Sequence, residues 1–157
     1  MNSITRSGLV AGAISGEVIV LLILVNTILI RDFARGNPGQ YGSVLGVWEI
    51  LYPLLIISVF EGGGIFSAWL IRKEVTTGKS SLIAGFITGI TIGIIFEIMW
   101  IANIISLVSH TVMNGSGYFA GYENIVLTIG LLIILAVMGG VLSAFGSYIY
   151  SVRKPGA

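Results

Sequence analysis

The sequence is poor in the residues that most often carry chemistry. Its 157 residues include no cysteine and one histidine, and 10% are charged, against about 25% in a typical soluble domain. Without cysteine there is no disulfide, no thiolate metal site and no thiol nucleophile. Asp32 is the one aspartate, so the usual acid–base pairs and histidine-containing metal clusters are also missing. We therefore expect no enzymatic activity, no metal and no cofactor, and the net charge of +1 argues against a nucleic-acid partner.

Apolar residues dominate what remains. Hydrophobic residues make up 55% of the chain, and the mean hydropathy is +1.01. A helix needs about 20 apolar residues to cross the hydrocarbon core of a bilayer. Four runs of that kind lie near residues 8 to 30, 47 to 71, 81 to 108 and 125 to 150. Barrel strands would instead alternate in polarity. The sequence therefore predicts an all-α integral membrane protein with four transmembrane helices in a single domain, residues 1–157.

The basic residues predict how these helices are oriented. Six of them fall on one side of the predicted membrane, namely Arg6, Arg72, Lys73, Lys79, Arg153 and Lys154. The other side carries Arg31 and Arg35. Because cytoplasmic loops are enriched in lysine and arginine, both termini are expected in the cytoplasm of a multi-pass cell-membrane protein. The first apolar run is too long for the core of a signal peptide, so we expect it to be retained as a helix.

Two pairs of similar segments indicate an internal duplication. GLVAGAISG at 8–16 is similar to SLIAGFITG at 81–89, and GGIFSAW at 63–69 is similar to GGVLSAF at 139–145. The pairs occur in the same order with nearly the same spacing, although glycine-rich membrane helices can also resemble one another through composition alone. The interpretation we favour is two helical hairpins, about 8–71 and 81–150, related as parallel repeats by a pseudo-twofold axis along the membrane normal.

Small residues at spacings of four indicate where the helices pack. In lipid, helices associate through close contact at such positions, because no hydrophobic force drives one helix against another. The predicted packing residues are Gly12, Gly16, Gly64, Ala68, Gly85, Gly89, Gly93, Gly140 and Ala144. They are expected to join the helices into a four-helix bundle. The same residues could instead face a second copy of the chain.

Three glutamates lie deep in the apolar runs: Glu17, Glu61 and Glu97. An acidic residue at the centre of a membrane helix costs roughly 2.5–3.5 kcal/mol. No lysine or arginine lies at the same depth, so an ion pair within the chain is not expected. Helical spacing places each glutamate on a row with small residues, which predicts that all three point into the protein. They would be either protonated and hydrogen-bonded, with Asn26, Thr91 or Asn103 as partners, or charged around a cavity or cation.

The second apolar run carries further signs of a local site. Pro53 should kink or loosen this helix, and Gly62, Gly63 and Gly64 follow directly after Glu61. Helices interrupted by proline and glycine beside a carboxylate are typical of binding sites in transporters. Glycine at these positions could equally serve close packing.

The duplicated motifs LVAGAISG with GGIFSAW, and LIAGFITG with GGVLSAF, resemble those of small four-span archaeal and bacterial membrane proteins of unknown function. The resemblance implies a four-span fold and no particular activity. Two functions stay open. The favoured one is a non-catalytic structural or assembly subunit that forms oligomers or binds other membrane proteins in the bilayer. The alternative is a proton- or cation-conducting protein that uses Glu17, Glu61 and Glu97.

Overall fold

The computed structural model describes residues 2–36, 41–72, 78–113 and 122–153. It contains four helices: α1 (Ser3–Gly36), α2 (Tyr41–Ile71), α3 (Gly78–Met113) and α4 (Tyr122–Arg153). No strand occurs among the described residues. The all-α prediction is confirmed, and each helix extends beyond the apolar run from which it was predicted. Pro53 lies inside α2, which continues through it.

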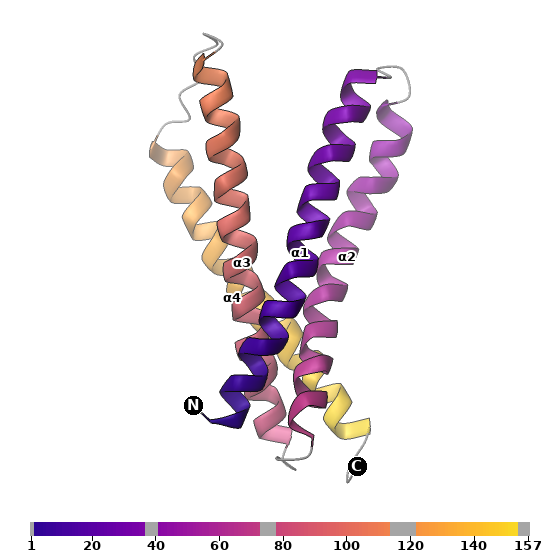
Figure 1. The fold of residues 1–157 in the computed structure, drawn as a ribbon, viewed down its shortest axis with the longest axis vertical. Helices are drawn as coiled ribbons and strands as arrows, with labels where there is room; N and C mark the ends of the chain where they lie inside the picture. Colours follow the sequence, from indigo (N-terminus) through magenta and orange to yellow (C-terminus); the bar gives the residue numbers. More distant parts are fainter. Residues whose placement is uncertain (1, 37–40, 73–77, 114–121, 154–157) are drawn as a thin grey trace.

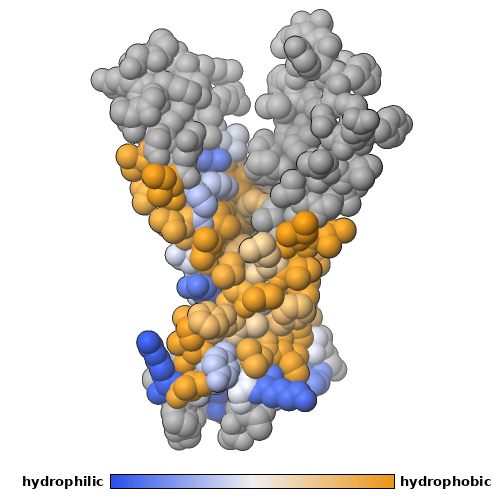
Figure 2. Space-filling model, turned by 180° about the vertical axis from the view of Figure 1, so that it is seen from behind, coloured by the Kyte–Doolittle hydropathy of each residue, from blue (hydrophilic) through white to orange (hydrophobic). Residues whose placement is uncertain are grey.

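Three helices contain segments long and apolar enough to span a membrane. These segments are Ser3–Ile28, Ile50–Ile71 and Gly78–Met99, with 26, 22 and 22 residues. At about 1.5 Å per residue each exceeds the roughly 30 Å of a hydrocarbon core. The expected fourth span, near 125 to 150, lies partly outside the residues whose side chains the structure describes. Figure 2 shows mostly hydrophobic side chains over the middle of the described surface, with a few hydrophilic patches among them, and further hydrophilic side chains at one end.

The helices form two hairpins that cross near one end of the molecule (Figure 1). The hairpin of α1 and α2 and the hairpin of α3 and α4 pack together at the end where α1 begins and α4 finishes, and they diverge toward the other end. Where they meet, Ile19, Ile23, Phe60 and Ile92 form a buried apolar cluster. Side chains from all four helices therefore hold the crossing together, because Leu142 of α4 packs against the same cluster.

The contacts between helices are not those of a twofold arrangement. Helix α2 packs against α1, α3 and α4, whereas α1 and α4 do not approach each other in the described parts of the chain. An axis that exchanges α1 with α3 and α2 with α4 would turn the contact of α2 with α3 into one of α4 with α1. The predicted pseudo-twofold axis is therefore not seen in these contacts, and the duplication stays a prediction from the sequence.

Candidate functional site

The glycine row of α1 lies against α3. A Cβ atom added at Gly12 would lie 2.5 Å from the Cβ of Thr91, and one added at Gly16 would overlap the side chain of Ile95. Gly8, which the sequence analysis did not single out, extends this row toward Ala84. The row therefore joins the two hairpins. A larger side chain at Gly8 or Gly12 would meet backbone and Cβ atoms of α3, whereas at Gly16 it would meet the end of the Ile95 side chain.

The matching glycine row of α3 has a different neighbour. A Cβ at Gly85 would lie 2.6 Å from the carbonyl oxygen of Ser143, and one at Gly93 would lie 2.8 Å from the Cα of Ala136. Gly89, between them, faces the backbone of Gly139 and Gly140. This row packs within the second hairpin, against α4. Similar sequence segments in the two halves thus make different contacts.

The contact of α2 with α4 also depends on small residues. Gly64 faces the backbone of Ser143, and Ala68 is buried. On α4, Gly140 faces Phe86 of α3, and Ala144 is half-buried beside Gly85. Gly62 is different, because nothing lies within 4 Å of the position its Cβ would take. The interruption at 62–64 therefore serves packing at Gly64 and leaves Gly62 on an exposed face.

Buried hydroxyl groups add hydrogen bonds between helices. The Thr88 hydroxyl donates to the carbonyl oxygen of Gly8 on α1 at 3.1 Å and to that of Ala84 at 2.9 Å. The Ser147 hydroxyl donates to the Ser81 carbonyl oxygen at 2.5 Å, joining α4 to α3. Sequence reasoning passed over these residues. For Thr88 the signal was the serine or threonine that recurs one residue before the last glycine of GLVAGAISG and SLIAGFITG, whereas Ser147 lies outside the paired motifs.

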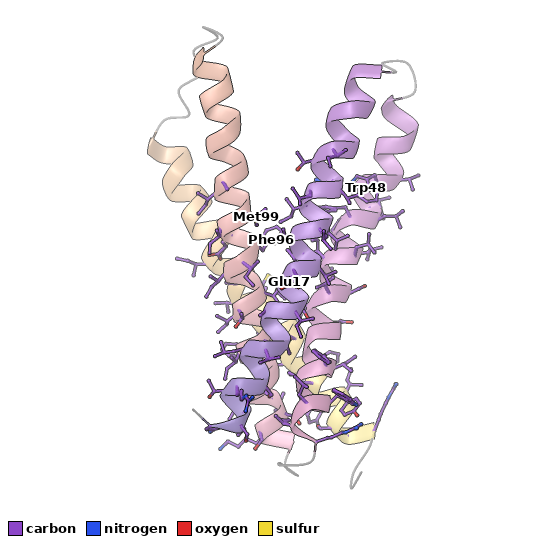
Figure 3. The ribbon with its side chains drawn as sticks, viewed as in Figure 1. Glu17, Trp48, Phe96 and Met99 are labelled. Carbon is purple, nitrogen blue, oxygen red and sulfur yellow. The ribbon has the colours of Figure 1, made fainter. Side chains whose placement is uncertain are left out.

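Two of the three expected partners of the glutamates, Asn26 and Thr91, form other hydrogen bonds, and the side chain of the third, Asn103, lies outside the part that the structure describes. The Trp48 indole nitrogen donates to Asn26 Oδ1 at 2.6 Å, which links α1 to α2. The Thr91 hydroxyl donates to the carbonyl oxygen of Ile87 in its own helix at 2.8 Å. Figure 3 labels Trp48 on α2 and, nearer the crossing, Phe96 and Met99 on α3 and Glu17 on α1.

Glu17 does not point into the protein, which corrects the prediction. It is exposed near the middle of the span Ser3–Ile28, and Ile14, Val18 and Leu21 around it are exposed as well. The reason is the choice of face: α1 buries Gly12 and Gly16 against α3, and each successive residue turns by about 100° around a helix. The row of Ala13 and Glu17 consequently faces away from the other helices.

Glu61 and Glu97 are half-buried, on α2 and α3. The Glu61 backbone carbonyl lies where a Cβ at Gly146 of α4 would be placed, so this turn of α2 is held close to α4. Glu97 Oε1 is buried and has no hydrogen-bond partner. It follows Gly93 along α3, one turn beyond the last glycine of the row that packs against α4. Glu97 is thus the candidate whose carboxyl group has the strongest need of a partner.

The three glutamates do not form a cluster that could bind a metal ion. In the described part of the chain, no group of three or more histidine, cysteine, aspartate or glutamate residues could hold a metal ion. Glu17 lies on an outward face, whereas Glu61 and Glu97 are partly enclosed by helix contacts. The arrangement offers one outward carboxyl group and two partly buried ones on different helices.

Fold and site together define a small all-helical protein with three segments able to span a membrane. Comparisons with models of protein families, with curated proteins and with solved structures found no match for this chain. Its function is therefore argued from the geometry of the chain itself.

Proposed function

We propose that the chain is a non-catalytic, membrane-embedded assembly subunit that binds another copy or another membrane protein through an outward apolar face. The observation that carries the proposal is the exposed position of Glu17 on α1. In a bilayer, an ionisable side chain facing lipid at mid-helix costs roughly 2.5–3.5 kcal/mol. Contact with a second protein surface would remove this group from lipid and offer it hydrogen bonds.

The packing inside the chain supports this proposal. A Cβ atom added at Gly12 of α1, at Gly85 or Gly89 of α3, or at Gly146 of α4 would clash with a neighbouring helix, so these faces are already occupied. The outward face of α1 consists instead of large apolar side chains around a carboxyl group. Association with a partner would therefore add contacts without disturbing the bundle.

Proton or cation conduction is the second candidate, and Glu97 is the observation that favours it. A buried carboxyl oxygen without a hydrogen-bond partner is uncommon, and in a membrane such a group often belongs to a proton or ion pathway. A pathway needs several groups in line, however, and Glu17 lies on the outside of the molecule. The exposed carboxyl group therefore favours assembly over conduction.

Quantitative co-purification from native membranes tests the assembly function. The wild-type chain should elute in a defined stoichiometric complex, and Glu17→Leu should reduce the recovered partner several-fold. Val18→Leu is the matched control, because it changes an exposed neighbour without altering polarity. A chain that elutes alone and as a monomer from mild detergent would contradict the proposal.

Flux measurements in liposomes test the second candidate. Wild type, Glu61→Gln and Glu97→Gln should all leave an imposed pH or cation gradient unchanged if the chain is only an assembly subunit. A flux that wild type supports and Glu97→Gln abolishes would establish conduction instead.

A further inference from the structure

Three side chains follow one another along α2 where this helix ends. The rings of Phe66 and Trp69 are nearly parallel, with an angle of 15° between their planes and 5.8 Å between their centroids. The guanidinium carbon Cζ of Arg72 lies over the Trp69 ring, 4.7 Å from its centroid, which is a cation–π contact. Residues three apart are neighbours on a helix surface, so the three side chains form one row. We call these three residues the Arg72 ladder.

The Arg72 ladder crosses the end of an apolar segment. Phe66 and Trp69 belong to the candidate span Ile50–Ile71, and Arg72 is the first residue after it. Phe66 is half-buried, whereas Trp69 is 42% exposed and Arg72 is exposed as well. A long basic side chain at the end of a membrane helix usually extends away from the bilayer. Here the guanidinium lies over the ring of the preceding turn, so its charge is held at the depth where the apolar segment ends.

The end of the molecule around the Arg72 ladder is positively charged. It carries the six basic residues that predict the orientation of the chain and one acidic residue, Glu74. The basic residues among them that the structure describes are all exposed, namely Arg6, Arg72, Lys79 and Arg153. Figure 2 shows strongly hydrophilic side chains at this end. An anionic group that approaches the Arg72 ladder therefore meets a favourable potential.

We propose that the Arg72 ladder binds an anionic phospholipid, with the phosphate on the Arg72 guanidinium and the apolar part of the lipid against Trp69 and Phe66. This inference rests on the membrane-embedded part of the proposed function and is independent of the assembly partner. A guanidinium that packs on an aromatic ring keeps its in-plane N–H donors available, and their fork matches the oxygens of a phosphate. The ladder is thus cationic at one end and apolar at the other.

The same geometry favours a lipid over a small soluble phosphate. Inorganic phosphate would use Arg72 and leave the exposed ring of Trp69 uncovered. A phospholipid in the adjoining leaflet places its headgroup at the end of the apolar segment and its chains beside the rings, so it matches both parts of the ladder at once. A net negative charge is required as well, because the cation of a zwitterionic headgroup is repelled by the basic residues at this end.

Electron spin resonance of spin-labelled lipids in phosphatidylcholine vesicles tests the site. Spin-labelled phosphatidylglycerol should be immobilised by the wild-type chain more strongly than spin-labelled phosphatidylcholine with the same acyl chains. Arg72→Gln should lower this preference at least about threefold more than Arg6→Gln, which removes the same charge from α1. If attraction depended on net charge alone, the two variants would lose the same amount, about fivefold each. Equal losses, or no preference in the wild-type chain, would overturn the inference.

The part that the ring plays is tested at Trp69, because substitutions there keep every charge. Trp69→Leu keeps an apolar side chain but removes the support of the guanidinium, and should lower the preference for phosphatidylglycerol about two- to fivefold. Trp69→Phe keeps an aromatic face and should retain most of the preference. A full preference in Trp69→Leu would overturn the ladder as the binding element. Circular dichroism verifies that each variant is helical.

Two further measurements separate this inference from its alternatives. Inorganic phosphate, compared with chloride at the same ionic strength, should leave the immobilised phosphatidylglycerol in place, and its displacement would overturn the assignment to a lipid. Extraction of native membranes with alkaline carbonate tests the embedding on which the inference rests. A chain that stays in the membrane but shows no preference for phosphatidylglycerol would overturn the lipid site alone, whereas a chain released by carbonate would overturn the membrane-embedded function as well.

Discussion

At the scale of single residues, Gly89 and Gly62 offer a matched test of close packing. A Cβ at Gly89 would meet the backbone of Gly139 and Gly140, which cannot move without separating α3 from α4. Gly89→Ala should therefore lower the free energy of unfolding by about 1–3 kcal/mol. Gly62→Ala has open space and should be neutral or stabilising, because alanine favours helices. Unfolding by denaturing detergent measures both, and an equal loss in the two variants would contradict the packing described for α3 and α4.

Glu97 is a residue-scale test of a different kind. Its Oε1 atom is buried without a hydrogen-bond partner, a situation that costs about 1–3 kcal/mol for a polar group. Glu97→Leu should raise the free energy of unfolding by a similar amount, while Glu97→Gln, which keeps a polar group there, should change it little. Thermal unfolding in detergent measures the difference. Destabilisation by Glu97→Leu would indicate that a bound cation or water pairs with this carboxyl group, and would strengthen the case for conduction.

At the scale of helices, Thr88 and Thr91 offer a matched comparison. The Thr88 hydroxyl forms a hydrogen bond between two helices, whereas the Thr91 hydroxyl forms one within its own helix. The Thr88 hydroxyl reaches the Gly8 carbonyl oxygen of α1 as well as the Ala84 carbonyl oxygen of its own helix, whereas the Thr91 hydroxyl donates to the Ile87 carbonyl oxygen within its own helix. Thr88→Val should lower stability by about 0.6–1.7 kcal/mol, the range for hydrogen bonds between membrane helices. Thr91→Val has the same change of shape and should have a smaller effect. If the two variants unfold alike, the bond to Gly8 does not hold α1 against α3.

The helices also show which structural features could be predicted from the sequence and which could not. Long apolar runs predict helices, because a helix satisfies its own backbone in lipid and barrel strands would alternate in polarity, and four helices are found. Rows of glycine predict which faces pack closely, but they do not predict which helix packs against each face. The row of Gly12 packs against α3, whereas the row of Gly85 packs against α4. Glu17 was misplaced for a related reason. Small residues lie on more than one face of α1, and the buried face is chosen by contacts between hairpins, which depend on residues far apart in the chain.

At the scale of the whole molecule, the alternating helices bring the start of α1 and the end of α4 to the same end (Figure 1). The predicted cytoplasmic location of that end depends on its basic residues, of which Arg6, Arg72, Lys79 and Arg153 lie in the described chain. Because the natural chain has no cysteine, variants with a single introduced cysteine test this location directly. An impermeant maleimide applied to intact cells should label Gly36→Cys, at the opposite end of α1, and should spare Ser3→Cys and Ser151→Cys until the cells are broken.

Each labelling outcome has a structural meaning. If Ser3→Cys and Ser151→Cys are both labelled and Gly36→Cys is spared, the molecule is inserted in the opposite orientation. The fold would still stand, because both termini would lie on one side of the membrane. Labelling of one of the two and not the other would contradict an even number of membrane crossings by these helices.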